Sequence, residues 1–416
     1  MDQDTSKTMA HHEVAADALA SDAAGLELLR AAAAAAHAAA AIIPTADQPR
    51  GNIALAAEWT QNYFDQPIDL TAYDAMADDT TRTPLFAAAI QRRLKGQVGW
   101  TVLDIGTGPH CLLALIAARA GARRVYAIEA NEAAAERARQ SVKLARDVPD
   151  GIVTVITGFS TSVTLPEKVD LVVAELVGSV ATSEGLISTM RDAQQRHLKR
   201  PFEPSSYIPQ RVQTAAAPAS YVLASLLRPP YSHRDVAAER AAAGGLPVLV
   251  GCADAALHRL SPPQILEDVD LTAPMPPLGR TLGARLRFRV DEAFVAAAEE
   301  THRTALGASL LQMSELGCDD QGVSRLARSI GASLAGLACW PRLLLDGSCG
   351  LIIEGDACSD DGDESHWQTA LPLLTARPVP VAAADEIDLA FEAMLGERVD
   401  EPVQYRLRGE LRPADK

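Results

Sequence analysis

Mainly apolar runs of five or six residues alternate with helical patterns through the middle of the chain. Residues 101–105, 124–129 and 169–173 are predicted to form strands that are buried on both faces of a parallel sheet. Residues 111–120, between the first two runs, carry the spacing of a helix. Because strands alternating with helices build parallel sheets, we expect an α/β fold with a Rossmann-type domain over residues 51–209.

The pattern changes after Pro209. Strand-like runs separated by turn residues favour a second, β-barrel-like domain over residues 210–416, with a helical insertion at about residues 220–265. The runs are residues 211–217, 285–290, 334–345, 350–354 and 367–374.

The N-terminal part is alanine-rich. Residues 13–43 predict one or two helices, which end at the break from Pro44 to Gly51. We therefore expect residues 1–50 to form an N-terminal helical extension, and a helix from Trp59 to Phe64 to begin the catalytic part.

A glycine turn follows the first predicted strand, in the segment from Asp104 through Gly106 and Gly108. A dinucleotide fingerprint would place a third glycine at position 111, but Cys111 stands there, which weakens an NAD interpretation. The next strand ends at Glu129, where a carboxylate can accept hydrogen bonds from both ribose hydroxyls of an adenosine. This combination favours an S-adenosylmethionine site.

Two carboxylates flank a second glycine turn. Glu175 follows the run at residues 169–173, and Glu184 stands nine residues later, beyond Gly178. Ligands of open α/β folds bind at the carboxyl end of the sheet, and two fixed carboxylates there can grip a guanidinium by charge-assisted hydrogen bonds. The structural alternative is that Glu184 caps a helix and Glu175 lies exposed at the rim.

From about Tyr63 to the C-terminus, the chain resembles the protein arginine N-methyltransferase family. Glu175 and Glu184 are similar to the double-glutamate loop of that family at its spacing. Other motifs of the family are matched by Tyr63-Phe64-Asp65 with Met76, Asp79, Arg82 and Thr83, by Asp104, Gly106, Gly108 and Glu129, by Tyr207-Ile208-Pro209, a junction commonly made through a cis proline, and by Ser365-His366-Trp367-Gln368-Thr369.

The resemblance implies a role for each matched residue. The catalytic set is Glu175 and Glu184, with His366 and Asp79 as a histidine–carboxylate pair, although a loop histidine can also be purely structural. Arg82 would bind the methionine carboxylate of the cofactor unless it is a solvated helix residue, and Met76 would pack on the sulfonium end. The remaining expected contacts are Tyr63, Phe64 and Trp367 to the substrate, and Tyr73, Asp104, Gly106, Gly108 and Glu129 to the cofactor. Gly158 and Phe159 follow the predicted strand at residues 153–157, and this position places them near the adenine of the cofactor.

The chain also departs from the family pattern. Pro67 replaces the second tyrosine of the N-terminal motif, and His110 occupies the third glycine position of the cofactor loop. Leu176 and Val180 stand where many relatives have aromatic residues, so the pocket is expected to be less aromatic than usual. These departures leave open an inactive relative that serves as a scaffold.

Composition limits the classes of partner and the cellular location that we expect for this protein. The formal net charge of −16 argues against nucleic acid and is compatible with a cationic substrate. The six cysteines show no metal spacing, which favours reduced thiols and a cytoplasmic location. The N-terminus lacks the basic start of a signal peptide, and the alanine run at residues 31–41 is too short to span a bilayer, so no membrane role is expected.

Together these features predict an S-adenosylmethionine-dependent N-methyltransferase that mainly monomethylates the guanidino group of arginine. The alanine-rich composition is typical of bacteria with GC-rich genomes, where such an enzyme could act on free L-arginine in antibiotic or other specialised biosynthesis. Arginine in a peptide or protein is the alternative substrate. In the resembled family, the insertion at about residues 220–265 forms a homodimer, and we expect the same here.

Overall fold

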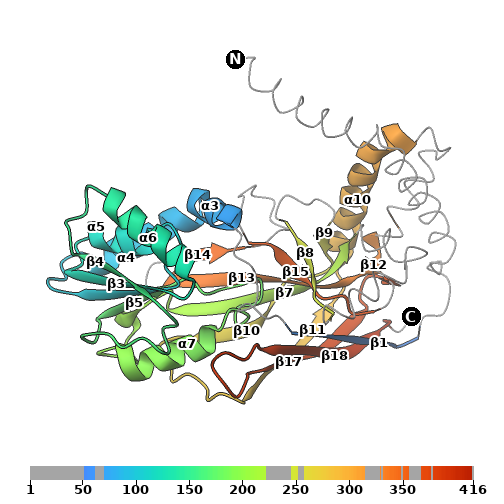
Figure 1. The fold of residues 1–416 in the computed structure, drawn as a ribbon. Helices are drawn as coiled ribbons and strands as arrows, with labels where there is room; N and C mark the ends of the chain where they lie inside the picture. Colours follow the sequence, from blue (N-terminus) through green and yellow to red (C-terminus); the bar gives the residue numbers. More distant parts are fainter. Residues whose placement is uncertain are drawn as a thin grey trace.

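The computed structural model describes residues 51–60, 70–221, 245–251, 257–313, 328, 331–347, 350–355, 367–375 and 378–414. The predicted N-terminal extension and the residues Tyr63, Phe64 and His366 lie outside these ranges. The described residues form a parallel-sheet half and an antiparallel half, which lie side by side (Figure 1).

The first half is a five-stranded parallel sheet with the strand order β4-β3-β2-β5-β6. Every residue of β2 and β5 is buried, as expected for the apolar runs that predicted these strands. The strands are β2 (Thr101–Ile105), β3 (Arg124–Glu129), β4 (Val153–Thr157), β5 (Leu171–Ala174) and β6 (Tyr207–Ile208). The helices are α3 (Leu70–Asp78), α4 (Arg82–Leu94), α5 (Leu112–Arg119), α6 (Glu132–Leu144) and α7 (Leu186–Asp192).

The second half is antiparallel, which confirms the predicted β-barrel-like domain. One sheet has the order β10-β7-β13-β15-β8, with β14 on β13 and β9 on β7, and a smaller one has the order β1-β18-β17-β11. The bounds are β1 (Ile53–Thr60), β7 (Arg211–Tyr221), β8 (Val248–Val250), β9 (Leu257–Arg259), β10 (Gln264–Asp270), β11 (Thr281–Arg289), β13 (Gly336–Asp346), β14 (Leu351–Glu354), β15 (Thr369–Leu371), β17 (Glu386–Met394) and β18 (Gln404–Arg412). A short pair joins β12 (Ser333–Leu334) to β16 (Val379–Pro380), and α10 (Glu292–Met313) projects away from the sheets (Figure 1).

The junction between the halves follows β6. The peptide bond between Ile208 and Pro209 is cis, as the resemblance implied. Strand β7 starts two residues later and, with β13, runs from the parallel-sheet half into the antiparallel half (Figure 1).

The prediction of a helix from Trp59 is wrong. Trp59 belongs to β1, which pairs antiparallel with β18 in the register Trp59↔Tyr405. Leu55 and Trp59 are both buried, and a spacing of four residues fits a helix as well as alternate positions of a strand. Residues 53–60 therefore complete a sheet of the second half, although the sequence suggested that the cofactor domain begins at residue 51.

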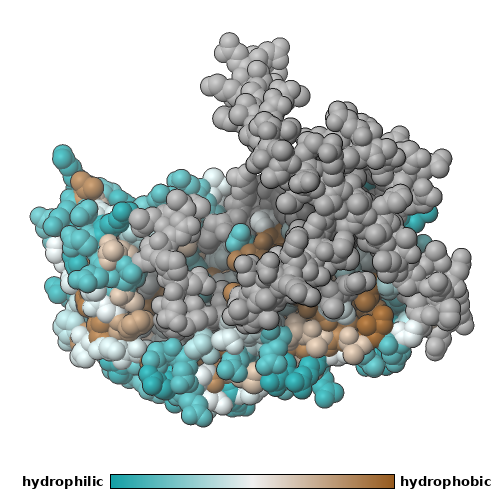
Figure 2. All heavy atoms as spheres, turned by 45° about the vertical axis from the view of Figure 1, so that its right-hand side comes forward, coloured by the Kyte–Doolittle hydropathy of each residue, from teal (hydrophilic) through white to brown (hydrophobic). Residues whose placement is uncertain are grey.

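The expected helical insertion is only partly described. Within residues 220–265, the described segments are the end of β7, the strands β8 and β9, and the start of β10, and residues 222–244 and 252–256 lie outside the described ranges. On the face drawn in Figure 2, the described surface is mainly hydrophilic along its lower edge, with apolar patches further up. None of the helices in the described ranges is long and apolar enough to cross a membrane.

Candidate active site

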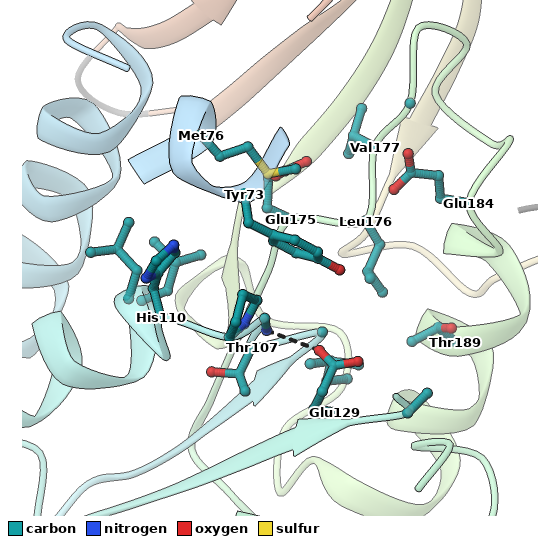
Figure 3. A pocket seen from close by; sticks show the side chains of 18 of the residues that line it. Tyr73, Met76, Thr107, His110, Glu129, Glu175, Leu176, Val177, Glu184 and Thr189 are labelled. Atoms are coloured by element: carbon teal, nitrogen blue, oxygen red, sulfur yellow. Dashed lines mark hydrogen bonds between the residues drawn. The ribbon is translucent and has the colours of Figure 1, made fainter. Parts of the chain in front are cut away.

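A cavity of about 310 Å³ opens where the carboxyl ends of β2, β3, β4 and β5 meet. Helix α3 contributes one wall, and residues of the antiparallel half contribute another. Figure 3 shows Glu129 at one end of this cavity and the two carboxylates of Glu175 and Glu184 at the other. The lining includes Tyr73, Met76, Arg82, Gly106, Gly108, Glu129, Gly158, Phe159, Glu175, Glu184 and Trp367, all of which the sequence nominated.

The glycine turn after β2 requires glycine at two positions. Gly106 and Gly108 have φ angles of +74° and +65°, a region that other residues rarely adopt. A Cβ atom on Gly106 would lie 2.7 Å from Cδ2 of Leu176, and one on Gly108 would lie 3.1 Å from the Tyr73 ring. The turn therefore packs closely between the loop after β5 and helix α3.

Asp104 lies behind this turn and does not line the cavity. Its Oδ2 accepts hydrogen bonds from Oγ1 of Thr107 at 2.6 Å and from the backbone N–H of Ala114 at 3.0 Å. Burial raises the pKa of Asp104 to about 7. The residue expected to contact the cofactor thus ties the glycine turn to α5 instead.

Glu129 lies at the tip of β3 and faces the cavity. Its Oε2 accepts from the backbone N–H of Gly108, and its Oε1 accepts from that of Asn131, each at 2.9 Å. A carboxylate offers about four lone-pair positions, so acceptor capacity for two ligand hydroxyls is left. The two backbone bonds fix the carboxylate against the glycine turn.

Arg82 is inside the protein at the start of α4, with an exposed fraction of 5%. Its Nη2 donates to Oε2 of Glu175 at 2.7 Å, so the alternative of a solvated helix residue is wrong. Asp79 accepts from the backbone N–H groups of Thr81 and Arg82 at 3.0 and 2.6 Å, and it does not line the cavity. Asp79 thereby fixes the turn that places Arg82 on Glu175.

Glu184 lines the cavity, and no described residue forms a hydrogen bond with its side chain. Helix α7 begins after Gly185 without a side-chain cap, so Glu184 is not the capping residue of the structural alternative. Burial, and then the neighbouring charge of Glu175, raises the pKa of Glu184 to about 8. The charge of Glu175 thus acts on Glu184, and both side chains line one cavity.

The loop between Glu175 and Glu184 is anchored to the antiparallel half. The indole Nε1 of Trp367 donates to the carbonyl oxygen of Val177 at 2.8 Å, and Oγ of Ser179 donates to that of Gln368 at 2.5 Å. These bonds attach the loop to Trp367 and Gln368, the two residues directly before β15, which also line the cavity. The predicted pairing of His366 with Asp79 lies outside the described residues and stays a prediction.

Several lining residues were not nominated as site residues. Nε2 of His110 lies 2.9 Å from Oδ1 of Asp74, which connects the glycine turn to α3, although the sequence had marked His110 only as a departure. Leu249 of β8 reaches the cavity with 51% of its surface exposed, and no motif marked it. Within the described ranges, no group of three residues could hold a metal ion.

Comparisons with known proteins agree with this architecture. Residues 77–194 match the family model described as ribosomal protein L11 methyltransferase (PrmA). The chain is 36% identical over 162 residues to protein arginine N-methyltransferase 6 of Danio rerio, a match that covers 39% of this chain and 44% of the relative. It is 40% identical over 138 residues to protein arginine N-methyltransferase PRMT10 of Oryza sativa subsp. japonica, covering 33% of this chain and 35% of the relative. The chain therefore spans less than half the length of these curated relatives.

Solved structures show the same fold. Protein arginine methyltransferase 10 of Arabidopsis thaliana superposes with a TM-score of 0.56 at 20% identity, covering 82% of this chain and 98% of that one. The PRMT1 enzyme–prozyme heterotetrameric complex of Trypanosoma brucei with AdoHcy gives a TM-score of 0.55 at 15% identity, with the same coverages of 82% and 98%. The resemblance inferred from the motifs is confirmed.

Proposed function

We propose that this relative of the protein arginine N-methyltransferases is an S-adenosylmethionine-dependent enzyme that methylates the guanidino group of arginine. The observation that carries the proposal is the half-buried carboxylate of Glu184, which has no hydrogen-bond partner among the described residues and lines the same cavity as Glu175. Desolvation and the neighbouring charge of Glu175 disfavour the ionised form of Glu184, and a cationic ligand that supplies hydrogen-bond donors would offset both.

The cofactor end of the cavity fits S-adenosylmethionine. Glu129 can accept from the ribose hydroxyls, and the glycines at 106 and 108 let the backbone approach the ligand closely. Met76, Gly158 and Phe159 line the same cavity, where they would contact the sulfonium and adenine ends. When bound, S-adenosylmethionine supplies an electrophilic methyl group on a positively charged sulfur.

At the other end, Glu175 and Glu184 would orient the guanidinium. A guanidinium stays protonated at neutral pH, and its lone pairs are delocalised. Carboxylates beside two of its nitrogens localise positive charge there, which leaves the third nitrogen a better nucleophile, and alignment with the methyl group supplies the rest. Glu184, whose pKa is raised to about 8, can accept the proton that the methylated nitrogen releases.

We propose free L-arginine as the substrate, on the strength of the alanine-rich composition described above. Arginine in a peptide is a second candidate, which one observation favours. Among the described lining residues, the basic side chains are Arg82, which is paired with Glu175, and His110, which contacts Asp74. The α-carboxylate of free arginine would find no unpaired basic side chain among these residues, whereas an arginine inside a peptide has no α-carboxylate.

The test measures kcat/KM for free L-arginine and for a peptide of arginine and glycine with the same protein sample. A higher value for free arginine supports the small-molecule proposal, and a higher value for the peptide replaces it by the second candidate. Tight binding of S-adenosylhomocysteine without transfer to either substrate would support an inactive scaffold and overturn the proposed activity.

We further propose that the dominant product carries one methyl group. Leu176 and Val180 are smaller than the aromatic residues of many relatives, but a released small product must compete with unmethylated arginine for re-entry. Mass spectrometry after many turnovers under limiting arginine should show a single added methyl group. Accumulation of a dimethylated species would contradict this.

The proposed enzyme acts in the cytoplasm as a homodimer, without nucleic acid or membrane partners. The homodimer rests on the resemblance of the insertion at about residues 220–265 to a family dimerisation arm. Sedimentation equilibrium of the full chain should give twice the monomer mass of 44.0 kDa. A monomer at micromolar concentration would contradict the assembly.

A further inference from the structure

A buried carboxylate contacts the loop that carries Glu184. Glu267 of β10 is 7% exposed and does not line the cavity. Its Oε1 accepts from Oγ1 of Thr182, and its Oε2 accepts from Oγ1 of Thr214, each at 2.6 Å. Thr182 stands two residues before Glu184 in the acid loop, which comprises residues 175–184. The acid loop is therefore hydrogen-bonded to a side chain of the antiparallel half.

The directions of these hydrogen bonds are linked. Thr214 Oγ1 accepts from the backbone N–H of Ala181 at 2.8 Å, and Thr182 Oγ1 lies 2.9 Å from the hydroxyl oxygen of Tyr405. Each threonine has one hydroxyl hydrogen, which it gives to Glu267, so Tyr405 must be the donor to Thr182. All donors of the cluster therefore point, directly or through a threonine, toward the Glu267 carboxylate.

The cluster joins the seven-stranded and the four-stranded sheet of the antiparallel half. Glu267 and Thr214 belong to β10 and β7, and Tyr405 belongs to β18. The Tyr405 ring stacks on that of Trp59 with 5.1 Å between centroids. The acid loop is thus anchored through one carboxylate to the packed core.

We propose that Glu267 is a positioning residue for the reaction. It accepts from the hydroxyls of Thr182 and Thr214, and Thr214 in turn accepts from the backbone N–H of Ala181. These bonds fix the acid loop and thereby set where the Glu184 carboxylate lies in the cavity. This inference rests on the proposed function. Glu267 does not line the cavity, so its effect would pass through Thr182 and, by way of Thr214, through Ala181 of the acid loop. A displacement of about 1 Å at a reacting centre can cost roughly a hundredfold in rate, so a loop that carries such a carboxylate needs a fixed anchor.

The test compares isosteric changes that remove single hydroxyls. Thr182→Val removes both the donor to Glu267 and the acceptor for Tyr405, and Thr182→Ser keeps both. Tyr405→Phe removes the hydroxyl donor to Thr182. Tyr207→Phe is the matched control, because the Tyr207 hydroxyl is also inside the protein and donates to a backbone carbonyl, that of Pro201, away from the acid loop.

In Thr182→Val, we expect kcat to fall roughly tenfold to a hundredfold. Because the anchor does not touch the cofactor end, the dissociation constant of S-adenosylhomocysteine should stay within about twofold of the wild type. Thr182→Ser should restore most of the rate, Tyr405→Phe should lose part of it, and Tyr207→Phe should retain it. A normal kcat in a folded Thr182→Val variant, or an equal loss in Tyr207→Phe, would overturn the proposal.

A readout without turnover separates this inference from the proposed function. Carbon-13 NMR of glutamate-labelled protein, assigned with Glu184→Gln, follows the titration of the Glu184 carboxyl. The titration midpoint should move from about 8 toward the ordinary glutamate value in Thr182→Val, because a released loop gains solvent, and it should stay in Tyr207→Phe. An unchanged midpoint in Thr182→Val overturns the positioning role even if the wild type methylates arginine. An inactive wild type overturns the proposed function, whatever the titration shows.

Discussion

Glu184 belongs to the acid loop and Glu267 contacts that loop through Thr182, and the surroundings of the two carboxyl groups are opposite. Both have a raised pKa, and burial is the main cause for each. Glu267 accepts from two threonine hydroxyls, whereas Glu184 has no hydrogen-bond partner among the described residues and is opposed by the charge of Glu175. Burial alone therefore does not separate a structural carboxylate from a functional one.

The difference lies in whether the protein itself meets the cost of burial. A satisfied buried carboxylate contributes to a defined packing arrangement, and an unsatisfied one keeps a free-energy cost that a ligand can remove. Glu184 faces a cavity of about 310 Å³, while Glu267 faces packed side chains. Proteins often give up some stability where they carry a functional site. The unfavourable surroundings of the ionised Glu184 carboxylate are of this kind.

The largest expected effect concerns the charge of the acid loop. Glu175→Gln and Glu184→Gln keep the side-chain shape but remove a carboxylate that would orient the guanidinium. Turnover of each variant should fall by roughly a hundredfold or more, as for other preorganised electrostatic contacts. Steady-state kinetics measures this, and Glu203→Gln, on an exposed turn, is the control. Near-normal turnover in either variant would remove that glutamate from the proposed mechanism.

A second prediction tests the opposite end of the cavity. Gly106→Val should weaken S-adenosylhomocysteine binding at least roughly tenfold, because a β-branched residue is strained at positive φ and collides with Leu176. Glu129→Ala should weaken it through loss of the hydroxyl acceptor.

Gly96→Val provides the backbone control, because Gly96 also has a positive φ, +77°, but no atom beyond its chain neighbours lies within 4 Å of the position that a Cβ would take. Calorimetry should show normal affinity for this variant. Unchanged affinity in Gly106→Val and Glu129→Ala would place the cofactor elsewhere.

Local patterns were sufficient to predict the cofactor half. The apolar runs of β2 and β5 and the positive-φ glycines at 106 and 108 are properties of short segments, and the structure confirms them. The acids at 129, 175 and 184 could be placed because strands of a parallel sheet end at one edge. Spacing along the chain was enough to bring these residues to one cavity.

Long-range pairing could not be predicted in this way. Trp59 was assigned to a helix because nothing near it reveals its partner Tyr405 on β18. Thr182 and Glu267 carry no motif, and only the packing of β10 against the acid loop joins them. Asp104 was expected in the cavity from its position in the motif, but that position does not tell to which side of a turn a side chain points. Its carboxylate instead accepts from the backbone of α5.

The third prediction concerns pH. In the free enzyme, the pKa of Glu184 is raised to about 8, so the carboxyl is mostly protonated at neutral pH. A guanidinium prefers the ionised form, so kcat/KM for arginine should rise by up to about tenfold per pH unit and level off above pH 8. Glu184→Gln should lose this rise, and a flat wild-type profile between pH 6 and 8 would contradict the assignment.

The smallest expected effect is on stability, and it separates the two carboxyl groups most directly. Folding raises the pKa of Glu184 from 4.5 to about 8, so the folded protein holds a proton that the unfolded chain has released. The stability contribution of this group therefore falls as pH rises through that window, and the full cost is present above it. Glu184→Gln removes the cost, so its Tm should exceed that of the wild type by roughly 2–4 °C at pH 8.5 and match it near pH 4.5. Glu267→Gln should instead lower Tm by a similar amount, because the amide nitrogen that replaces one carboxylate oxygen is a donor and cannot accept from a threonine hydroxyl. Differential scanning calorimetry at both pH values measures these changes, and a Glu184→Gln variant less stable than the wild type at pH 8.5 would show that Glu184 is a structural carboxylate like Glu267.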